Sequence, residues 1–447
     1  MTKERQRTIM LIVLLSYLII LIDNSLVFTC STEIGSSFNM STTSITWVSN
    51  AYALAFGGLL LLGGRLGDIL NRKNVFVVGL LFFGFSSLAV SMAPNSTTLI
   101  TFRAIQGCGA AIIAPATLAI IMDNFTGAAK THAIIIYGAM SGVGISIGLI
   151  IGAGITTIAS WRYGFLINFP ITILLIFLTL IYIPSNPVQY LKLDYIGALL
   201  SFIAITLIIN GINGIGPKEL SFILGIILLI IFIYREAHTE SKIMPLEIFH
   251  SRYRDYAYLI RFIYASAING FWFFTPRILQ SVFHYSPILV AVLFLPMTVV
   301  NYLAGQWVNK LVIKFQKELI VTIGLLLTTI GFLLLAFLHP ANNLIISLII
   351  PMMVIGVGQG LILSPVTSMG IAGLSSTIGG IASSVINVML QVGGIIGIAI
   401  LSILPSQHTN IGNYHIQMIV VTFFSLISLG ISLLAWRDAS KKIVSKR

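Results

Sequence analysis

The sequence predicts an all-α integral membrane protein, on the strength of its composition and of the way its apolar residues are grouped. Hydrophobic residues make up 57% of the 447 residues and charged residues only 9%, against roughly 25% charged residues in soluble domains. The apolar residues also gather in runs of about 20, the length that a helix needs to cross a bilayer. Because these runs are continuously apolar rather than alternating, they favour helices over a transmembrane barrel.

Fourteen apolar runs are long enough to span a membrane. They occupy residues 8–32, 46–64, 75–93, 98–122, 132–157, 164–184, 195–213, 219–235, 255–282, 287–311, 319–338, 344–368, 379–404 and 415–436. With the N-terminus placed inside, twenty of the 25 Lys and Arg residues lie in inner loops and tails, and only Arg162, Lys218 and Arg277 lie in outer loops. This bias follows the positive-inside rule and predicts fourteen spans with both termini inside.

The chain carries signs of two related halves. The turn after the second run contains Gly64 and Asp68, and the turn after the tenth run contains Gly305 and Asn309, each with flanking cations. A glycine and a polar residue four positions later therefore recur at matching places. Internal repeats of this kind are common in transporters, whose binding site lies where the repeats meet.

The simplest partition has three parts. We expect a six-helix bundle at 1–184, two additional transmembrane helices with a cytoplasmic linker at 185–254, and a second six-helix bundle at 255–447. We also expect the protein to work as a monomer embedded in the lipid bilayer.

Several classes of function are poorly supported by the sequence. The net charge of +12 is scattered over loops and one tail rather than gathered in a stripe, so we expect no nucleic-acid partner. Cys30 and Cys108 are far apart in or beside apolar runs, which predicts two free thiols rather than a disulfide framework. The sequence has neither a GxxxxGK[ST] phosphate-binding loop nor histidines at metal-ligand spacing, so we expect no enzyme, no metal and no other cofactor.

A carboxyl group inside the first apolar run is the leading candidate functional residue. Asp23 lies about fifteen residues into that run, roughly 22 Å from its inner end, and its helical neighbours include Ile19 and Leu26. Acids within a membrane span are costly and usually functional, and desolvation favours their neutral form. We expect Asp23 to load and release a proton. The alternative is a structural acid that is hydrogen-bonded to Ser or Asn on another helix.

Two further charged residues accompany Asp23. Arg103 enters the run at 98–122 from the outer side, at a depth similar to that of Asp23, and is therefore a candidate partner. Its alternative is an arginine whose charged head extends to the outer interface. Glu33, near the outer end of the first run, is either an ordinary solvated acid or a group that lines the outer mouth.

Small and aromatic residues complete the candidate positions. Glycines expected to allow close helix packing, and the rocking of one half against the other, are Gly107, Gly142, Gly144, Gly148 and Gly152. Together with Asp23 and Glu33, the side chains expected to line a cavity for flat or cationic ligands are Phe28, Trp47, Tyr52, Trp272 and Phe273. Most aromatic residues in spans instead face lipid or pack within the bundle.

The loop after the second run resembles a motif of the major facilitator superfamily. Gly64-Arg-Leu-Gly-Asp68, followed by Arg72 and Lys73, is similar to the family's loop between spans two and three. The resemblance implies that Gly64, Asp68, Arg72 and Lys73 form a cytoplasmic latch between helices. Asn71 departs from the pattern, because the family usually has glycine at this position.

Other motifs resemble the fourteen-span drug:proton antiporters within that superfamily. The segment from Arg103 to Gly107 is similar to the span-four motif whose arginine is implicated in proton transfer. Ile-Asp23-Asn-Ser-Leu-Val is similar to the group's span-one motif, and the segment 161–170 is similar to the start of its span six. In two places the chain departs from the group. In span five, Gly148 is followed by Leu149, where the group usually has a Gly-Pro pair. In the outer half of span one, Phe28 and Thr32 replace the usual Asn and Pro.

The resemblance implies a proton-coupled exporter in a bacterial plasma membrane. Its substrates would be amphipathic, often cationic drugs, including dyes, quaternary ammonium antiseptics and fluoroquinolones, exported by alternating access. Asp23 would carry the proton, Arg103 would tune it, and Glu33 would contribute to a second proton or cation site. A narrow-specificity metabolite or metal-tetracycline/proton exchanger is the alternative, and a non-transporting membrane protein is a third possibility from a different class.

Overall fold

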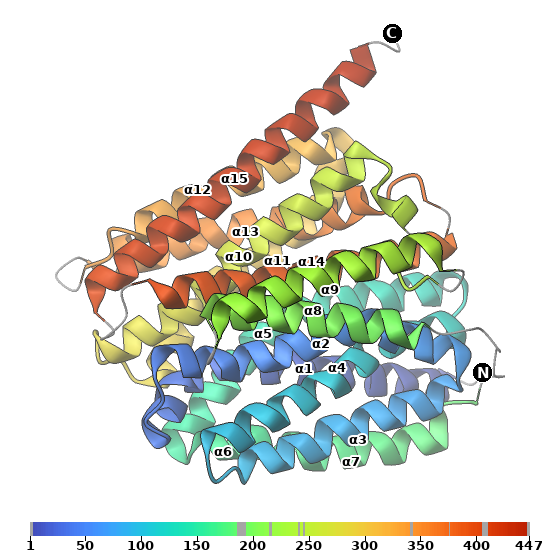
Figure 1. Ribbon diagram of the computed structural model, residues 1–447, viewed down its shortest axis with the longest axis horizontal. Coiled ribbons are helices and arrows are strands. Elements are labelled where there is room, and N and C mark those ends of the chain that lie inside the picture. Colours follow the sequence, from blue (N-terminus) through green and yellow to red (C-terminus); the bar gives the residue numbers. More distant parts are fainter. Residues whose placement is uncertain are drawn as a thin grey trace. The chain divides into compact units, whose positions relative to one another are not determined.

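The structure is a computed structural model that describes residues 3–185, 194–213, 217–239, 242–244, 246–339, 343–374, 376–404 and 410–444. All regular elements within these residues are helices, as predicted. The chain divides into two compact units, Met1–Met244 and Pro245–Arg447 (Figure 1).

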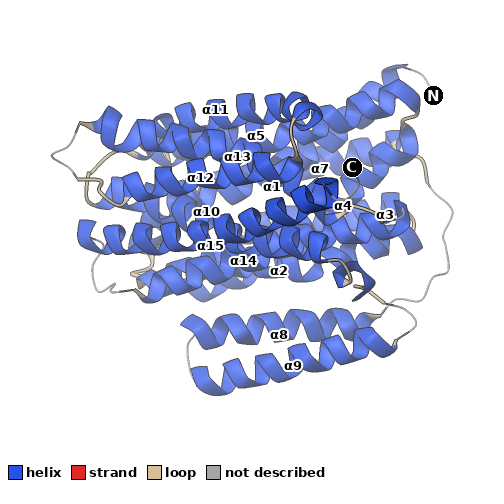
Figure 2. Ribbon diagram, turned by 90° about the horizontal axis from the view of Figure 1, so that it is seen from above, coloured by secondary structure: helices blue, strands red, loops and turns tan. Residues whose placement is uncertain are grey.

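The first unit holds nine helical segments. They are α1 (Lys3–Ser37), α2 (Thr42–Ile69), α3 (Arg72–Ser91), α4 (Ser96–Asn124), α5 (Gly127–Ile158), α6 (Trp161–Leu166), α7 (Asn168–Tyr182), α8 (Tyr195–Asn213) and α9 (Lys218–His238) among the described residues. Helix α4 packs on α2 and α3, α5 packs on α1, and α7 packs on α3. Helices α8 and α9 run side by side and reach the rest of this unit mainly through α2 (Figure 2).

The second unit repeats this all-helical organisation. Its described elements are η1 (Leu246–Phe249), α10 (Arg252–Ser281), α11 (Pro287–Lys314), α12 (Lys317–Leu335), η2 (Ile345–Ile349), α13 (Ile350–Gly370), α14 (Ser376–Ile403) and α15 (Ile411–Val444). Helix α13 packs on α11 and α12, while α10 packs on α14 and α15.

Eleven helices in the described part of the chain are long and apolar enough to cross a membrane. They are α1, α3, α4, α6 with α7, α8, α9, α11, α12, η2 with α13, α14 and α15. Helices α2, α5 and α10, which are 28, 32 and 30 residues long, are not among these eleven, and α2 and α5 contain residues whose side chains lie outside the described part of the chain. The structure therefore supports a membrane protein with eleven to fourteen spans.

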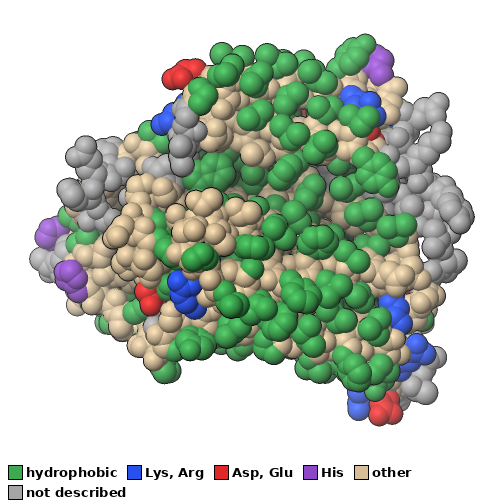
Figure 3. Space-filling model, turned by 60° about the horizontal axis from the view of Figure 1, so that its bottom comes forward, with side chains coloured by type: hydrophobic (Ala, Val, Ile, Leu, Met, Phe, Trp, Pro, Cys, Tyr) green, Lys and Arg blue, Asp and Glu red, His purple; other side chains and the backbone are tan. Residues whose placement is uncertain are grey.

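Large apolar side chains on the outer faces of the helices are exposed. Phe82, Phe85 and Phe177, for example, are 47%, 54% and 60% exposed. On the face drawn in Figure 3, apolar side chains dominate and charged ones lie mostly towards its edges. Such a surface is stable only against lipid, because soluble proteins rarely expose large contiguous apolar patches.

Polar side chains fix where several helices begin. Ser41, Asn71, Asn95, Ser160 and Ser286 each precede a helix and accept a hydrogen bond from a backbone N–H of its first turn. This capping satisfies N–H groups that have no partner within the helix. At Asn71 it also gives a physical reason for the departure from glycine, since the side-chain oxygen accepts from the N–H groups of Lys73 and Asn74.

One close helix–helix contact occurs in the same form within each of the two units. A methyl group added at Gly107 of α4 would meet the backbone carbonyl of Tyr52 and lie 3.0 Å from Cβ of Ala55 on α2. A methyl group added at Gly360 of α13 would likewise meet the carbonyl of Asn301 and lie 2.8 Å from Cβ of Ala304 on α11. The same glycine contact therefore recurs in both units, as expected of related halves.

A second glycine of α13 makes a similar contact, because a Cβ added at Gly356 would meet the backbone carbonyl of Met297 on α11. The correspondence between the turns at Gly64 and Gly305 therefore stays a prediction.

Candidate functional site

Asp23 lies on α1 in the interior of the first unit, and its side chain is fully buried. The close approach of α5 shields this part of α1. A Cβ at Gly148 would collide with the Ser25 hydroxyl and lie 2.7 Å from Cα of Ile22, so only glycine allows this spacing. Gly144 and Gly152 lie against neighbouring turns of α1, and Gly142 is also part of α5. The predicted glycine seam is therefore a contact between α1 and α5 inside one unit.

Three side chains from two other helices donate hydrogen bonds to the Asp23 carboxylate. Arg103 Nη1 lies 2.5 Å from Oδ2, Gln106 Nε2 lies 2.7 Å from Oδ1, and Asn168 Nδ2 lies 3.0 Å from Oδ1. The pairing of Asp23 with Arg103 that was expected from their similar depth is confirmed. Every one of these groups donates, so the arrangement stabilises the ionised carboxylate.

Arg103 has partners besides Asp23. Its Nε donates to the backbone carbonyl of Val48 at 3.0 Å, and its Nη1 donates to Gln106 Oε1 at 2.6 Å. The guanidinium carbon also lies 4.4 Å from the ring centroid of Tyr52. These contacts hold the cation inside the unit by interactions that do not depend on Asp23, so Arg103 does not extend to the interface.

Gln106 connects the ion pair to α3. Its carbonyl oxygen accepts from Arg103, while its amide nitrogen donates to both Asp23 and the hydroxyl of Ser87, which is 2.6 Å away. Ser87 in turn donates to the carbonyl of Phe83. The amide orientation of Gln106 is therefore fixed by partners at both ends.

Asn168 reaches the site from the junction of α6 and α7. Its neighbour Ile167 separates the two segments, although the Ile167 backbone stays in the helical region. Pro170 has no N–H and cannot donate to the carbonyl of Leu166, which interrupts the hydrogen-bond ladder here. The sequence predicted one continuous span at 164–184, whereas the structure begins this span at Trp161 and breaks it beside Asn168.

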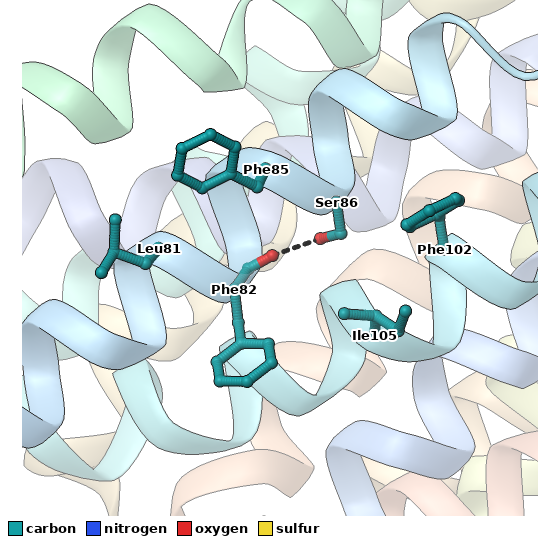
Figure 4. Close-up of a pocket in the computed structure, with 6 residues that line it drawn as sticks. All are labelled: Leu81, Phe82, Phe85, Ser86, Phe102 and Ile105. Carbon is teal, nitrogen blue, oxygen red and sulfur yellow. Dashed lines mark hydrogen bonds between the residues drawn. The ribbon is translucent and has the colours of Figure 1, made fainter.

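An apolar groove is lined by residues of α3 and α4. It has a volume of about 330 Å³. Its lining residues are Leu81, Phe82, Phe85, Ser86, Phe102 and Ile105 (Figure 4). The hydroxyl of Ser86, the polar side chain among them, donates to the carbonyl of Phe82 at 2.5 Å. Ser86, Phe102 and Ile105 are the chain neighbours of Ser87, Arg103 and Gln106, so the same two helices, α3 and α4, supply the groove and part of the network.

Glu33 lies apart from the Asp23 network, near the outer end of α1. Its carboxylate is within hydrogen-bonding reach of the backbone N–H of Trp161, the first residue of α6. Trp161 Nε1 also donates to the hydroxyl of Ser37. The structure thus places Glu33 at the start of α6, where a carboxylate is favoured by the unpaired backbone N–H groups. Its role as a second proton or cation site stays a prediction.

Of the four predicted latch residues, the structure describes the contacts of Gly64, Arg72 and Lys73. Arg72 Nη1 lies 2.5 Å from Asp123 Oδ1 at the end of α4, and Lys73 Nζ donates to the carbonyl of Leu180 at 2.7 Å. The side chain of Asp68 lies outside the described residues, and a Cβ at Gly64 would make an ordinary contact with Pro115. Arg72 and Lys73 therefore bind the ends of α4 and α7 within the first unit, and their role as a latch stays a prediction.

The predicted ligand-lining aromatic residues are divided between the units. Phe28 and Tyr52 are buried and Trp47 is half-buried in the first unit. In the second unit, Trp272 and Phe273 are buried on α10 among other aromatic rings. Tyr52 is the member of the set that the structure joins to the Asp23 network, through its ring contact with Arg103.

Gln106, Asn168 and Ser87 were not among the predicted site residues. All three are polar side chains inside apolar runs, which is the signal that singled out Asp23. Gln106 lies one helical turn after Arg103, and Asn168 lies within the motif at the start of span six. Within the described residues, no group of three or more His, Cys, Asp or Glu side chains could hold a metal ion.

Solved membrane transporters share this fold. The crystal structure of the POT family transporter PepTSo matches with a TM-score of 0.74 and 13% sequence identity, over 97% of this chain and 98% of that one. At this level of identity the likeness shows the fold alone.

Sequence relatives give the family. Puromycin resistance protein pur8 of Streptomyces alboniger is 31% identical over 411 residues, covering 90% of this chain and 82% of its own. Multidrug efflux pump LfrA of Mycolicibacterium smegmatis is 27% identical over 412 residues, covering 90% and 81%. The profile of the Major Facilitator Superfamily matches residues 13–398. The chain therefore belongs to the Major Facilitator Superfamily, and it is a multi-pass plasma-membrane transporter rather than an enzyme.

Proposed function

We propose that this transporter is a proton-coupled efflux antiporter for amphipathic, often cationic compounds, such as dyes, quaternary ammonium antiseptics and fluoroquinolones. The observation that carries the proposal is the fully buried pair of Asp23 and Arg103, 2.5 Å apart within the first unit. Buried charges inside a membrane bundle are costly and mark ion pathways and proton relays. The name of the relative LfrA, a multidrug efflux pump, supports the same reading.

The charge of the network supplies the coupling. When Asp23 is ionised, the pair carries no net charge and a cationic drug approaches without repulsion. When Asp23 takes a proton, the charge of Arg103 is no longer balanced. The Arg103 side chain stays in place because it keeps its contacts with Val48, Gln106 and Tyr52. Two unit charges about 10 Å apart repel by roughly 1.7 kcal/mol at an effective dielectric constant of 20. Proton and drug therefore disfavour each other, as antiport requires.

The wider arrangement belongs to the same proposal. The chain has fourteen spans with both termini inside, and bundles at 1–184 and 255–447 alternate access to the substrate. The two additional helices and the linker occupy 185–254. Glu33 contributes a second proton or cation site, aromatic residues of both bundles contact the drug, and the protein acts as a monomer.

Reconstitution in liposomes that enclose a pH-sensitive dye tests the function. Addition of a quaternary ammonium compound should drive proton movement in liposomes with the unaltered protein, and Asp23→Asn should abolish it. Asp194→Asn is the matched control, because Asp194 is a buried carboxylate paired with Arg235 at the start of α8. Drug-driven proton movement that survives Asp23→Asn undiminished would overturn the assignment of the proton carrier.

A narrow-specificity exchanger is the second candidate. It is favoured by the name of pur8, which refers to resistance to one antibiotic. A panel of chemically unrelated drugs in the same liposomes separates the two readings. Proton movement with several classes supports multidrug efflux, and movement with a single class supports the narrow exchanger.

A further inference from the structure

Asn168 uses only one end of its side-chain amide. Its Nδ2 donates to Asp23 Oδ1 at 3.0 Å, and its own Oδ1 is buried without a hydrogen-bond partner among the described residues. The whole residue is 1% exposed. A buried amide oxygen that accepts no hydrogen bond is unfavourable in this state, so it calls for a second state in which the oxygen is used.

The other two ligands of Asp23 have no such freedom. Gln106 donates from Nε2 to Asp23 and Ser87 and accepts at Oε1 from Arg103, so turning its amide would break three hydrogen bonds. Arg103 carries donors only and cannot accept a hydrogen bond in any orientation. Asn168 is therefore the one ligand of this carboxylate, among the described residues, that can change from donor to acceptor.

We propose that Asn168 responds to the protonation state of Asp23 by turning its side-chain amide. The inference rests on the proposed function, in which Asp23 takes a proton from the aqueous phase. With Asp23 ionised, Asn168 donates through Nδ2, as the structure shows. When a proton binds Oδ1 of Asp23, the amide rotates by half a turn, and its Oδ1 accepts from the new O–H group. Asp23 goes from a charge of −1 to neutral, and Asn168 remains neutral throughout.

Few other titratable groups lie near Asp23 among the described residues. The titratable groups that face Asp23 from neighbouring helices are Arg103 of α4 and Tyr52 of α2. Tyr17, which stacks on Tyr137 of α5, precedes Asp23 by six residues on α1, about 9 Å away along the helix axis. Because the amide nitrogen and oxygen exchange positions when the amide turns, the change needs no rearrangement of these groups.

Infrared difference spectroscopy of the full-length protein in lipid nanodiscs tests the inference. Acidification should produce a carboxylic-acid C=O band that is absent from Asp23→Asn and therefore belongs to Asp23. Asn168→Leu should shift that band, since the O–H group loses its acceptor. Asn168→Ser should restore a band close to the original position, because a hydroxyl both donates and accepts. Asn50→Leu is the matched control, as it removes a buried amide of the same unit that has no bond to Asp23 among the described residues.

A second measurement observes the asparagine side chain itself. In protein labelled with ¹³C at the side-chain carbonyl of asparagine, one labelled amide band should shift on acidification, and that shift should be missing from Asn168→Ser. If the Asp23 band appears but is indifferent to Asn168→Leu, or if Asn50→Leu shifts it equally, the inference fails while the proposed function stands. If no Asp23 band appears in the unaltered protein, both fail.

Discussion

Removal of the Arg103 guanidinium should expose the cost of an unbalanced charge at Asp23. In Arg103→Met the carboxylate keeps its amide donors, Gln106 and Asn168, but loses the cation 2.5 Å away. A buried ion pair that loses one partner typically destabilises a protein by about 3–5 kcal/mol. Arg103 also loses its bond to the Val48 carbonyl and its contact with the Tyr52 ring, each worth about 1 kcal/mol.

A double-mutant cycle separates these contributions. The Val48 and Tyr52 contacts are lost equally in Arg103→Met and in Asp23→Asn with Arg103→Met, so they cancel from the comparison of the pair. The double variant buries no charge and should recover most of the 3–5 kcal/mol expected for the uncompensated carboxylate. For a domain of 150–250 residues this recovery corresponds to roughly 6–20 °C in melting temperature.

The assay is thermal unfolding of the purified protein followed by tryptophan fluorescence. Arg162→Met is the matched control, because Arg162 is bonded to the carbonyls of Ser91 and Ala93 and to no carboxylate among the described residues. Combining Asp23→Asn with Arg162→Met should therefore give additive effects. Acidification should also stabilise Arg103→Met relative to the unaltered protein, since a protonated Asp23 needs no cation. Additive effects of Asp23→Asn and Arg103→Met would refute the reasoning.

Three further outcomes follow from other parts of the first unit. Burial acts to raise the pKa of Asp194, but hydrogen bonds from Arg235 and a backbone N–H lower it below its usual value of 3.8. The start of α8 should therefore keep its hydrogen-exchange protection at neutral and mildly acidic pH and lose it only as the pH falls below about 4, after correction for intrinsic exchange rates. Gly148→Val should destabilise the protein by about 1–3 kcal/mol by separating α5 from α1. Gly154→Val, where a Cβ meets nothing within 4 Å, should change the melting temperature little. Asn71→Ala should cost about 0.5–2 kcal/mol in thermal unfolding through loss of the α3 cap, and an unchanged melting temperature would contradict that role.

The sequence predicted the helical membrane fold and one contact of the site correctly for the same physical reason. A charge in an apolar run is so unfavourable that it must find a partner, and depth along two helices was enough to pair Asp23 with Arg103. The number of spans stays a prediction: in the described part of the chain eleven helices are long and apolar enough to cross a membrane, against the fourteen predicted.

The remainder of the site depends on how helices rotate about their axes, which spacing along the chain does not determine. Asn168 lies 145 residues from Asp23, and Ser87 lies 19 residues from Gln106 on a different helix. Their amide and hydroxyl groups carry no charge, so they gave a weaker signal than Arg103 did.

Proton counting on drug binding tests the central claim most directly. Purified protein in weakly buffered solution with a pH indicator should release protons when a quaternary ammonium compound is added, because the cation favours the ionised form of Asp23. Asp23→Asn should still be folded and should release about one proton fewer per molecule than the unaltered protein. Equal proton release by the two proteins at saturating drug would contradict the account.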